Sequence, residues 1–218
     1  MDSNLLAHLR YRNLRYRFPQ FFQNKHGVEY VDDQDTILEW ERENSETIGV
    51  ICKTNYEITV VDLIREDGKL KPHSRIIVPD NGVIIIPRVG DKFVFEDQYR
   101  HPSGGRFLVF PRGHGEYGAT PEEDAAREIR EELGGAVIRN LSYLGRTYPE
   151  TNSNIWYCTV WIGDVDEKSL KLRKGFEGIE NILLMTERQV NERIAMGGIT
   201  CGYTLAAWAL FNSARSVN

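Results

Sequence analysis

The amino-acid sequence predicts an α+β fold, and three observations support this class. Short segments rich in β-branched residues, separated by turns that contain Gly or Pro, occupy much of residues 47–96 and predict strands. A glycine-rich loop that starts at residue 111 leads into a strongly specified helix. Two more helices are predicted near the end of the chain, at residues 187–195 and 203–214.

The first part of the chain begins with a basic segment. Residues 4–17 are predicted to form a short helix that ends at Phe18-Pro19, because a proline disfavours helical backbone in the residue before it. A solvated helix or arm is favoured over one that contacts phosphate. Strands are expected at residues 47–53, 57–64 and 74–78, with a hairpin turn at Glu66-Asp67-Gly68. Residues 1–75 should therefore form a helix or arm together with a small antiparallel β-sheet.

The second part, residues 76–218, is expected to hold a larger sheet. Its strands are predicted at residues 82–89, 92–96, 136–146 and 154–163. The continuous apolar run Val83-Ile84-Ile85-Ile86 is typical of a strand that is buried on both faces. A polar loop at 147–153 and a charged segment at 164–178 connect the later elements.

The helix after the glycine-rich loop has clear ends. Thr120 and Glu123 have the spacing of a capping box, and Pro121 falls at the first helical position. The stop comes from Gly134 and its neighbour, because glycine adopts the left-handed conformation at little cost. The sequence thus predicts a helix over residues 121–133.

This helix has an apolar and an acidic side. Ala125, Ile129 and Leu133 recur at helical spacing and predict the buried stripe. The acidic side carries Asp124, Glu128, Glu131 and Glu132. Like charges at this spacing repel each other. The patch is therefore either a solvated helix face or a site for a hard divalent cation such as Mg²⁺ or Mn²⁺, which prefer oxygen ligands.

The string around this helix resembles the signature of the Nudix hydrolases, in which a glycine-led loop precedes the segment Arg-Glu-U-x-Glu-Glu-x-Gly-U, where U is a bulky aliphatic residue. The matching positions are Gly113, Arg127, Glu128, Ile129, Glu131, Glu132 and Gly134. Two positions depart: Ala119 replaces the first expected glutamate, and Gly135 replaces the last aliphatic residue. Glu123, four residues before Arg127, could serve as the partner of that arginine instead.

A second resemblance narrows the family to its ADP-ribose pyrophosphatase-like branch. Gln98, Tyr99 and Arg100 match a motif before the signature, and Pro111 leads into Gly113 as in the branch. Val109 stands where the branch carries a glutamate, which leaves one substrate or metal contact without its residue. The resemblance implies an α/β/α sandwich with a mixed central sheet over residues 76–218. It also implies that residues 1–75 contribute to a homodimer and to substrate contacts.

The resemblance further implies a set of site residues. Glu128, Glu131, Glu132 and the main-chain carbonyl of Arg112 would hold Mg²⁺ or Mn²⁺. Substrate would contact Arg100, Gln98 and Tyr99, with Arg100 on phosphate because a guanidinium matches phosphate oxygens in bidentate fashion. A structural ion pair is the other interpretation of Arg100. The catalytic candidates are Glu177 first, Glu180 second, and Glu131.

The expected reaction is metal-dependent hydrolysis of a nucleoside diphosphate linked to a second group, foremost ADP-ribose to AMP and ribose 5-phosphate. The alternatives are hydrolysis of another nucleoside diphosphate sugar or a dinucleoside polyphosphate, and a sensor that binds a nucleotide sugar without cleaving it. The absent glutamates at 109 and 119 favour the sensor, whereas the three retained signature glutamates favour hydrolysis.

Composition bounds the partners and the location. The net charge of −5 argues against general nucleic-acid binding. Three widely separated cysteines match no zinc spacing and suit a reducing compartment. The sequence shows no apolar run of the ~18 residues that a membrane span needs. We therefore expect a cytoplasmic protein with a small-molecule substrate and no membrane partner.

Overall fold

The structure, a computed structural model, describes residues 3–78, 80–153 and 155–216. The chain divides into two compact units. Unit 1 comprises Met1–Pro79 and Glu150–Trp156, and unit 2 comprises Asp80–Pro149 and Tyr157–Asn218. This division differs from the expected boundary after residue 75 because the last strand of unit 1 runs on to Ile77, and because Ile76 N donates to Ser153 O.

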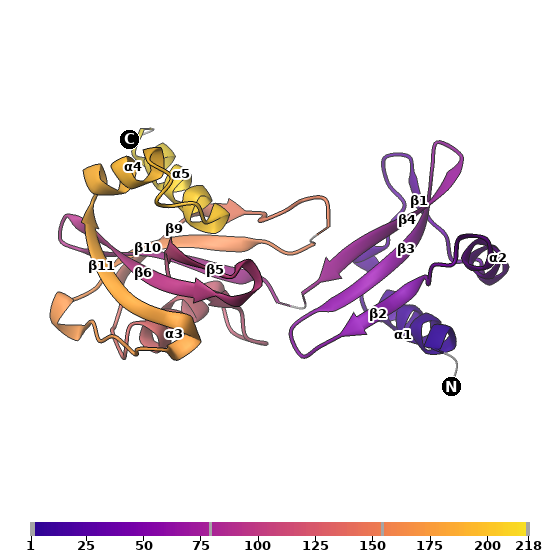
Figure 1. Cartoon of the computed structure of the whole chain (residues 1–218), viewed down its shortest axis with the longest axis horizontal. Coiled ribbons are helices and arrows are strands. Elements are labelled where there is room, and N and C mark those ends of the chain that lie inside the picture. Colours follow the sequence, from indigo (N-terminus) through magenta and orange to yellow (C-terminus); the bar gives the residue numbers. More distant parts are fainter. Residues whose placement is uncertain (1–2, 79, 154, 217–218) are drawn as a thin grey trace. The chain divides into compact units, whose positions relative to one another are not determined.

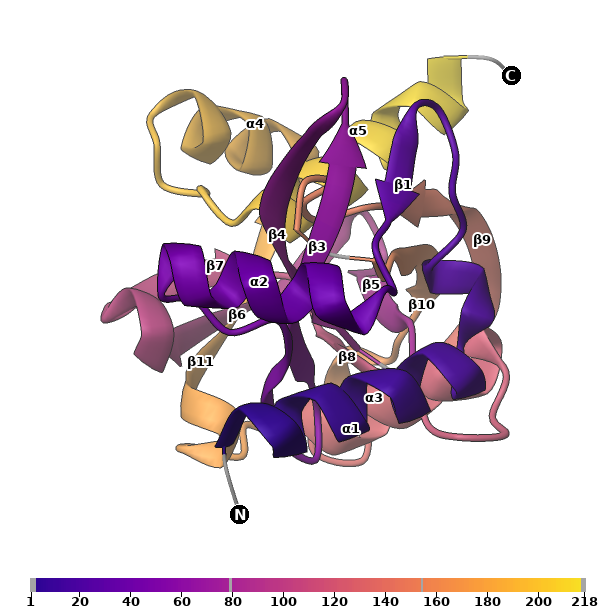
Figure 2. The same cartoon turned by 90° about the vertical axis from the view of Figure 1, so that its right-hand side faces the viewer.

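Unit 1 is a small sheet with two helices, α1 and α2 (Figure 2). Its elements are α1 (Ser3–Arg17), β1 (Val28–Tyr30), α2 (Gln34–Asn44), β2 (Gly49–Lys53), β3 (Ile58–Glu66) and β4 (Lys69–Ile77). Strand β3 pairs with each of the other three strands, always antiparallel. The expected basic helix and antiparallel sheet are both present.

The interior of unit 1 has two apolar clusters. Tyr11 and Leu14 of α1 pack with Val60, whereas Ile37 and Trp40 of α2 pack in the other cluster. Helix α2 was not predicted from the sequence, because its apolar stripe is short and most of its eleven residues are polar. Its start could have been found from the N-cap residue at position 33, whose side chain accepts from the backbone three residues later.

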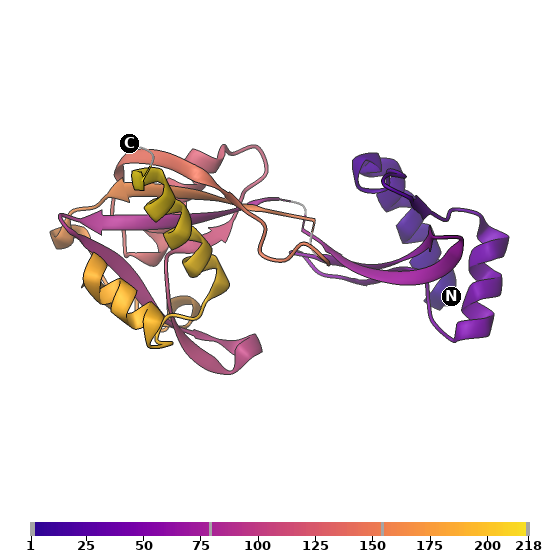
Figure 3. The ribbon, with the colours of Figure 1, turned by 90° about the horizontal axis from the view of Figure 1, so that it is seen from above.

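Unit 2 is built on a mixed sheet of seven strands (Figures 1 and 3). Its elements are β5 (Gly82–Val89), β6 (Lys92–Arg100), β7 (Gly105–Val109), β8 (Arg112–His114), α3 (Pro121–Glu132), β9 (Arg139–Thr147), β10 (Cys158–Asp164), β11 (Ile179–Thr186), α4 (Glu187–Ala195) and α5 (Gly202–Ser216). The strand order is β11-β6-β5-β10-β9, with β7 on β6 and β8 on β5. Strands β5 and β10 run parallel, and the other strand pairs among the described residues of this sheet are antiparallel.

Helices cover both faces of this sheet, so the predicted α/β/α sandwich is confirmed. Helix α3 lies on one face, and α4 and α5 lie on the other (Figure 1). Ala125, Ile129 and Leu133, the predicted stripe of α3, are fully buried in the core that includes Val94. Phe93 instead makes edge contacts with Trp208 of α5. Because side chains alternate along a strand, even-numbered residues in this part of β6 point towards α3.

Strand β6 is longer than predicted. It continues from Glu96 through Gln98 to Arg100, and it pairs with β11 on one side and β7 on the other.

The three cysteines form no disulfides. None of the helices in the described ranges reaches the length and apolar character that a membrane crossing requires.

Candidate active site

Helix α3 begins with the capping box that the sequence predicts. Thr120 N donates to Glu123 Oε2 at 2.8 Å, and Glu123 N donates to Thr120 Oγ1 at 3.3 Å. Both halves of the reciprocal cap are therefore present. The Glu123 carboxylate is occupied by Thr120, so the expectation that it pairs with Arg127 is wrong.

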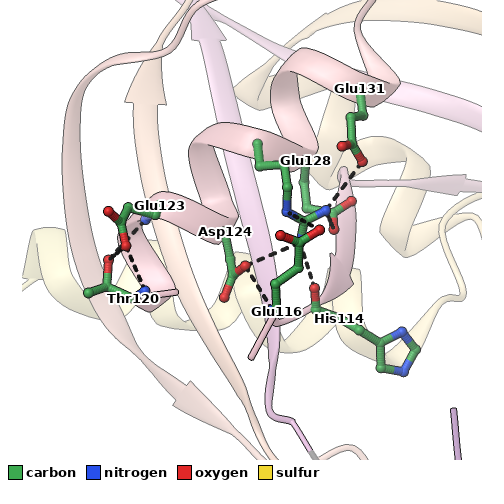
Figure 4. A network of polar contacts seen from close by, with 8 residues as sticks. His114, Glu116, Thr120, Glu123, Asp124, Glu128 and Glu131 are labelled. Carbon is green, nitrogen blue, oxygen red and sulfur yellow. Dashed lines mark hydrogen bonds and ion pairs between the residues drawn. The ribbon is translucent and has the colours of Figure 1, made fainter. Parts of the chain in front are cut away.

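Arg127 links the glycine-rich loop to α3, and Figure 4 labels its partners His114, Glu116, Asp124, Glu128 and Glu131. Its guanidinium donates to the main-chain oxygen of His114 at 2.7 Å and lies 2.8 Å from Glu128. It also contacts Asp124 and Glu131, each at 3.2 Å. The Arg127 guanidinium thus forms ion pairs with several acidic groups of α3. Its hydrogen bond to His114 positions the loop where it leaves strand β8.

Two groups of Glu116 tie the loop that contains Ala119 to α3. Glu116 lies 3.5 Å from the Nε of Arg127, three positions before Ala119. Its backbone N–H donates to Asp124 Oδ1 at 3.0 Å. The loop is therefore tied to α3 by both a side chain and a main-chain group.

The carboxylates of Glu128 and Glu132 lie against strand β8. A Cβ atom on Gly113 would be only 2.0 Å from Glu128 Oε1, so the missing side chain makes room for that carboxylate. Arg112 N donates to Glu132 Oε2 at 3.0 Å. Both glutamates are buried, whereas about half of the Glu131 side chain, 47%, is exposed. The solvated-face interpretation therefore fits Glu131 but not Glu128 or Glu132.

Sequence reasoning missed Glu96, which belongs to the same acidic cluster. It is fully buried in β6, and neither of its carboxylate oxygens has a hydrogen-bond partner in the part of the chain that the structure describes. Burial raises its pKa to about 8, and the negative charges of Glu177 and Glu128 act in the same direction. A carboxylate two residues after Val94, on the helix-facing side of a strand, was the signal that could have identified it.

Burial also raises the pKa values of the two glutamates of α3. The pKa of Glu128 rises to about 7, although the neighbouring Arg127 charge opposes the shift. The pKa of Glu132 lies well above its usual range, chiefly through burial and then through the charges of Glu96, Glu128 and Glu177. Carboxylates that perturb each other in this way are typical of a functional site.

Arg100 and Arg112 accompany these acids and also have buried atoms without partners among the described residues. Within the described ranges, Arg100 Nε and Nη2 and Arg112 Nε have no hydrogen-bond partner. Burial, followed by the Arg112 charge, lowers the pKa of Arg100. The Arg112 guanidinium lies 4.1 Å from the centre of the Tyr203 ring, which positions it by a cation–π contact. The unpaired N–H groups of Arg100 can receive an anion.

The segment before β11 brings Glu177 to β6. Gln98 Nε2 donates to the main-chain oxygen of Glu177 at 2.9 Å, and Glu177 has a left-handed backbone with φ of 47°. The charge of Glu177 acts on Glu96, Glu128 and Glu132. By contrast, Glu180 lies 3.8 Å from Lys174 and its charge acts on Arg106.

The structure separates the three residues of the motif on β6. Gln98 is buried and shares a strand side with Arg100. Tyr99 points to the opposite side and is 44% exposed. A substrate contact from Tyr99 stays a prediction.

The donor set suits a divalent ion, although in the described residues no three His, Cys, Asp or Glu side chains meet as a ready-made metal site. Glu128 and Glu131 are instead directed to Arg127. Among the residues that the structure describes, both carboxylate oxygens of Glu96 and Oε1 of Glu132 have no hydrogen-bond partner. Clustered, unsatisfied carboxylate oxygens are the ligands that hard cations take, so these residues fit Mg²⁺ or Mn²⁺.

Comparisons with known proteins agree with this fold. The family model of the NUDIX domain matches residues 78–197, which is more than half of the chain. Among solved structures, an ADP compounds hydrolase matches with a TM-score of 0.65 at 15% sequence identity. The match covers 75% of this chain and 89% of that hydrolase. Among curated proteins, none matches.

Proposed function

The chain belongs to the NUDIX domain family of pyrophosphohydrolases, and from this premise we propose that it hydrolyses the pyrophosphate bond of a nucleoside diphosphate linked to a second group. ADP-ribose is the first substrate to consider, with AMP and ribose 5-phosphate as products. Mg²⁺ or Mn²⁺ is the proposed cofactor.

One observation carries this proposal: buried acidic and basic groups that influence one another's pKa values have no hydrogen-bond partner within residues 3–78, 80–153 and 155–216. Glu96 and Glu132 have unsatisfied oxygens, and Arg100 has unsatisfied N–H groups. Each such group costs about 1–3 kcal/mol when it is left without a partner, and more when it is charged. A metal diphosphate satisfies both kinds of group, because its cation takes carboxylate oxygens and its anion takes guanidinium N–H groups.

The proposed metal-holding residues are Glu128, Glu131, Glu132 and the main-chain carbonyl of Arg112. A bound divalent ion supplies charge neutralisation for the diphosphate and lowers the pKa of water. Arg127 forms ion pairs with both Glu128 and Glu131. Its contacts keep two acids close together that would otherwise repel each other.

The proposed phosphate contact is Arg100. Its unpaired Nε and Nη2 are two N–H-bearing atoms of one planar guanidinium, which is the arrangement that binds two phosphate oxygens. Gln98, on the same side of β6, has an unpaired side-chain oxygen and anchors the Glu177 segment. Gln98 therefore acts as a positioning residue for Glu177.

Glu177 is the proposed general base, because its charge reaches the acidic cluster. It would remove a proton from the attacking water, and a base placed in this way contributes about 10²–10⁴-fold to the rate. Glu180 is the second candidate and Glu131 the third. A homodimer and a cytoplasmic location stay predictions.

A substrate panel tests the function. Purified protein is incubated with ADP-ribose, GDP-mannose, UDP-glucose, NADH and diadenosine polyphosphates, with Mg²⁺ or Mn²⁺, and a phosphatase couple reports phosphate from the newly formed monoesters. We expect the largest release with ADP-ribose and none with chelator. Preference for another conjugate would revise the substrate alone. Binding of a nucleotide sugar without release from any conjugate would favour the sensor.

A further inference from the structure

We propose that Glu96 is an additional ligand of the divalent ion, contributed by strand β6 rather than by helix α3. This inference rests on the proposed function, because it assigns a residue to the same metal site. Glu96 lies outside the signature segment, and no role was predicted for it from the sequence.

The position of Glu96 points to a ligand rather than to a structural acid. Its side chain faces α3, is fully buried, and has no hydrogen bond to either oxygen in the described part of the chain. The charge of Arg100 attracts it, whereas the charges of Glu177 and Glu128 repel it. A buried acid with this environment destabilises the protein on its own, so its presence is explained by a cation that it helps to hold.

The register of the sheet adds a second observation. Glu96 is directly opposite Val109 in the antiparallel pair of β6 and β7. Side chains opposite each other lie on the same face of a sheet, with Cβ atoms about 4.5–5.5 Å apart. Val109 is 1% exposed, so the two side chains share one buried space. Position 109 is also where the sequence resemblance led us to expect a glutamate.

These observations support the idea that a carboxylate at position 96 of β6 takes the place of a carboxylate at position 109 of β7. A carboxylate on β7 at position 109 and a carboxylate on β6 at position 96 would enter the same region next to α3. The exchange keeps the number of acids and nearly keeps the buried volume, because one Val and one Glu trade places. It predicts that the function of Glu96 can be moved to position 109.

Equilibrium binding of Mn²⁺ to the full chain, without substrate, tests this proposal. Electron paramagnetic resonance measures the free Mn²⁺ during a titration of wild type, Glu96→Gln, Asp97→Asn, and the exchanged variant Glu96→Val with Val109→Glu. Asp97 is the matched control, because it is the next residue on β6 and pairs with Arg106 at 2.7 Å instead of facing α3. Circular dichroism confirms that each variant is folded.

We expect Glu96→Gln to weaken Mn²⁺ binding at least about tenfold, as the loss of a group that supports a metal typically does. Asp97→Asn should bind like wild type, and the exchanged variant should recover most of the lost affinity. Wild-type affinity in folded Glu96→Gln overturns the proposal, as does equal weakening in folded Asp97→Asn.

The same titration separates this proposal from the proposed function. Tight Mn²⁺ binding that depends on Glu96, in a protein that cleaves no conjugate of the panel, supports the ligand and contradicts the hydrolase. Metal-dependent hydrolysis, together with Mn²⁺ binding that is unchanged in Glu96→Gln, supports the hydrolase and contradicts the role of Glu96 as a ligand. A wild-type protein that binds no Mn²⁺ overturns both.

Discussion

Gly113 connects backbone geometry to the chemistry of the site. Its lack of a side chain is what lets the Glu128 carboxylate lie against strand β8, since an added Cβ would be 2.0 Å from Glu128 Oε1 and 2.1 Å from Glu128 Cδ. The obstructed atoms are the end of a flexible side chain, which can swing away. The glycine is therefore needed for the position of one carboxylate more than for the fold.

Gly113→Ala should lower turnover at least tenfold, because a misplacement of about 1 Å can cost about 10²-fold in rate. Its melting temperature should stay close to that of wild type, since Glu128 can rotate to relieve the clash. Gly202→Ala is the control, because a Cβ there meets nothing within 4 Å. Steady-state kinetics and thermal unfolding measure both effects. Unfolding of Gly113→Ala, or turnover equal to the control, would contradict this role.

Glu96 should make the metal-free protein less stable as the pH rises. Its folded pKa of about 8 lies above the ordinary value of 4.5, so the folded state keeps a proton that the unfolded state releases. The free energy of unfolding therefore falls progressively as the pH rises from the ordinary pKa of 4.5 to the folded pKa of about 8. Glu128 and Glu132 shift in the same direction and add to the loss.

With chelator present, the melting temperature of wild type should fall more between about pH 5 and pH 8 than that of Glu96→Gln. The glutamine carries no titrating proton and removes one buried charge from the cluster. Differential scanning calorimetry at the two pH values measures the difference. Parallel declines in the two proteins would show that Glu96 ionises normally in the folded state.

Among the secondary-structure elements, those with strong local signals were the ones predicted accurately. Helix α3 has a capping box and a stripe of alanine and branched aliphatic residues, and it begins at the predicted residue. Strand β8 has only three residues, Arg112–His114, and is defined by its pairing with β5. Such a strand has no local pattern of its own, because pairing with a distant segment is what creates it.

The position of the segment Phe176–Gly178 also depends on tertiary packing. Gly175 and Gly178 have positive φ values, and a Cβ on Gly178 would be 2.5 Å from the main-chain oxygen of Tyr99. These backbone features hold Glu177 beside β6. The sequence placed Glu177 ahead of Glu180 as a candidate, and the tertiary packing shows that their carboxylates have different surroundings.

Glu177→Gln should lower turnover by about 10²-fold or more at saturating metal, as expected for loss of a general base. Glu180→Gln should cause a smaller loss, because its carboxylate lies near Lys174. Single-turnover kinetics isolates the chemical step for both variants. If neither variant slows that step, the base lies elsewhere, and the polar loop at 147–153 is the next place to search.

Across the two units, the sequence predicted the class of fold and the acidic helix but not the full site. The α/β/α sandwich and the antiparallel N-terminal sheet both agree with the structure. Glu96 was missed because its proximity to α3 depends on the order of strands in the sheet. The partner of Arg127 was assigned wrongly because helical spacing alone does not show that Thr120 already occupies Glu123.

Glu132→Gln tests most directly whether the buried acids act on a metal-bound diphosphate. The substitution removes one charge and nearly keeps the shape of the side chain, whose Oε2 accepts from Arg112 N. Turnover of the best substrate is measured for wild type and variant at saturating Mg²⁺ and with chelator. We predict a loss of at least about 100-fold in the variant, as for removal of a charge-stabilising group at a reacting centre. Near wild-type turnover with an unchanged dependence on metal would contradict the assignment.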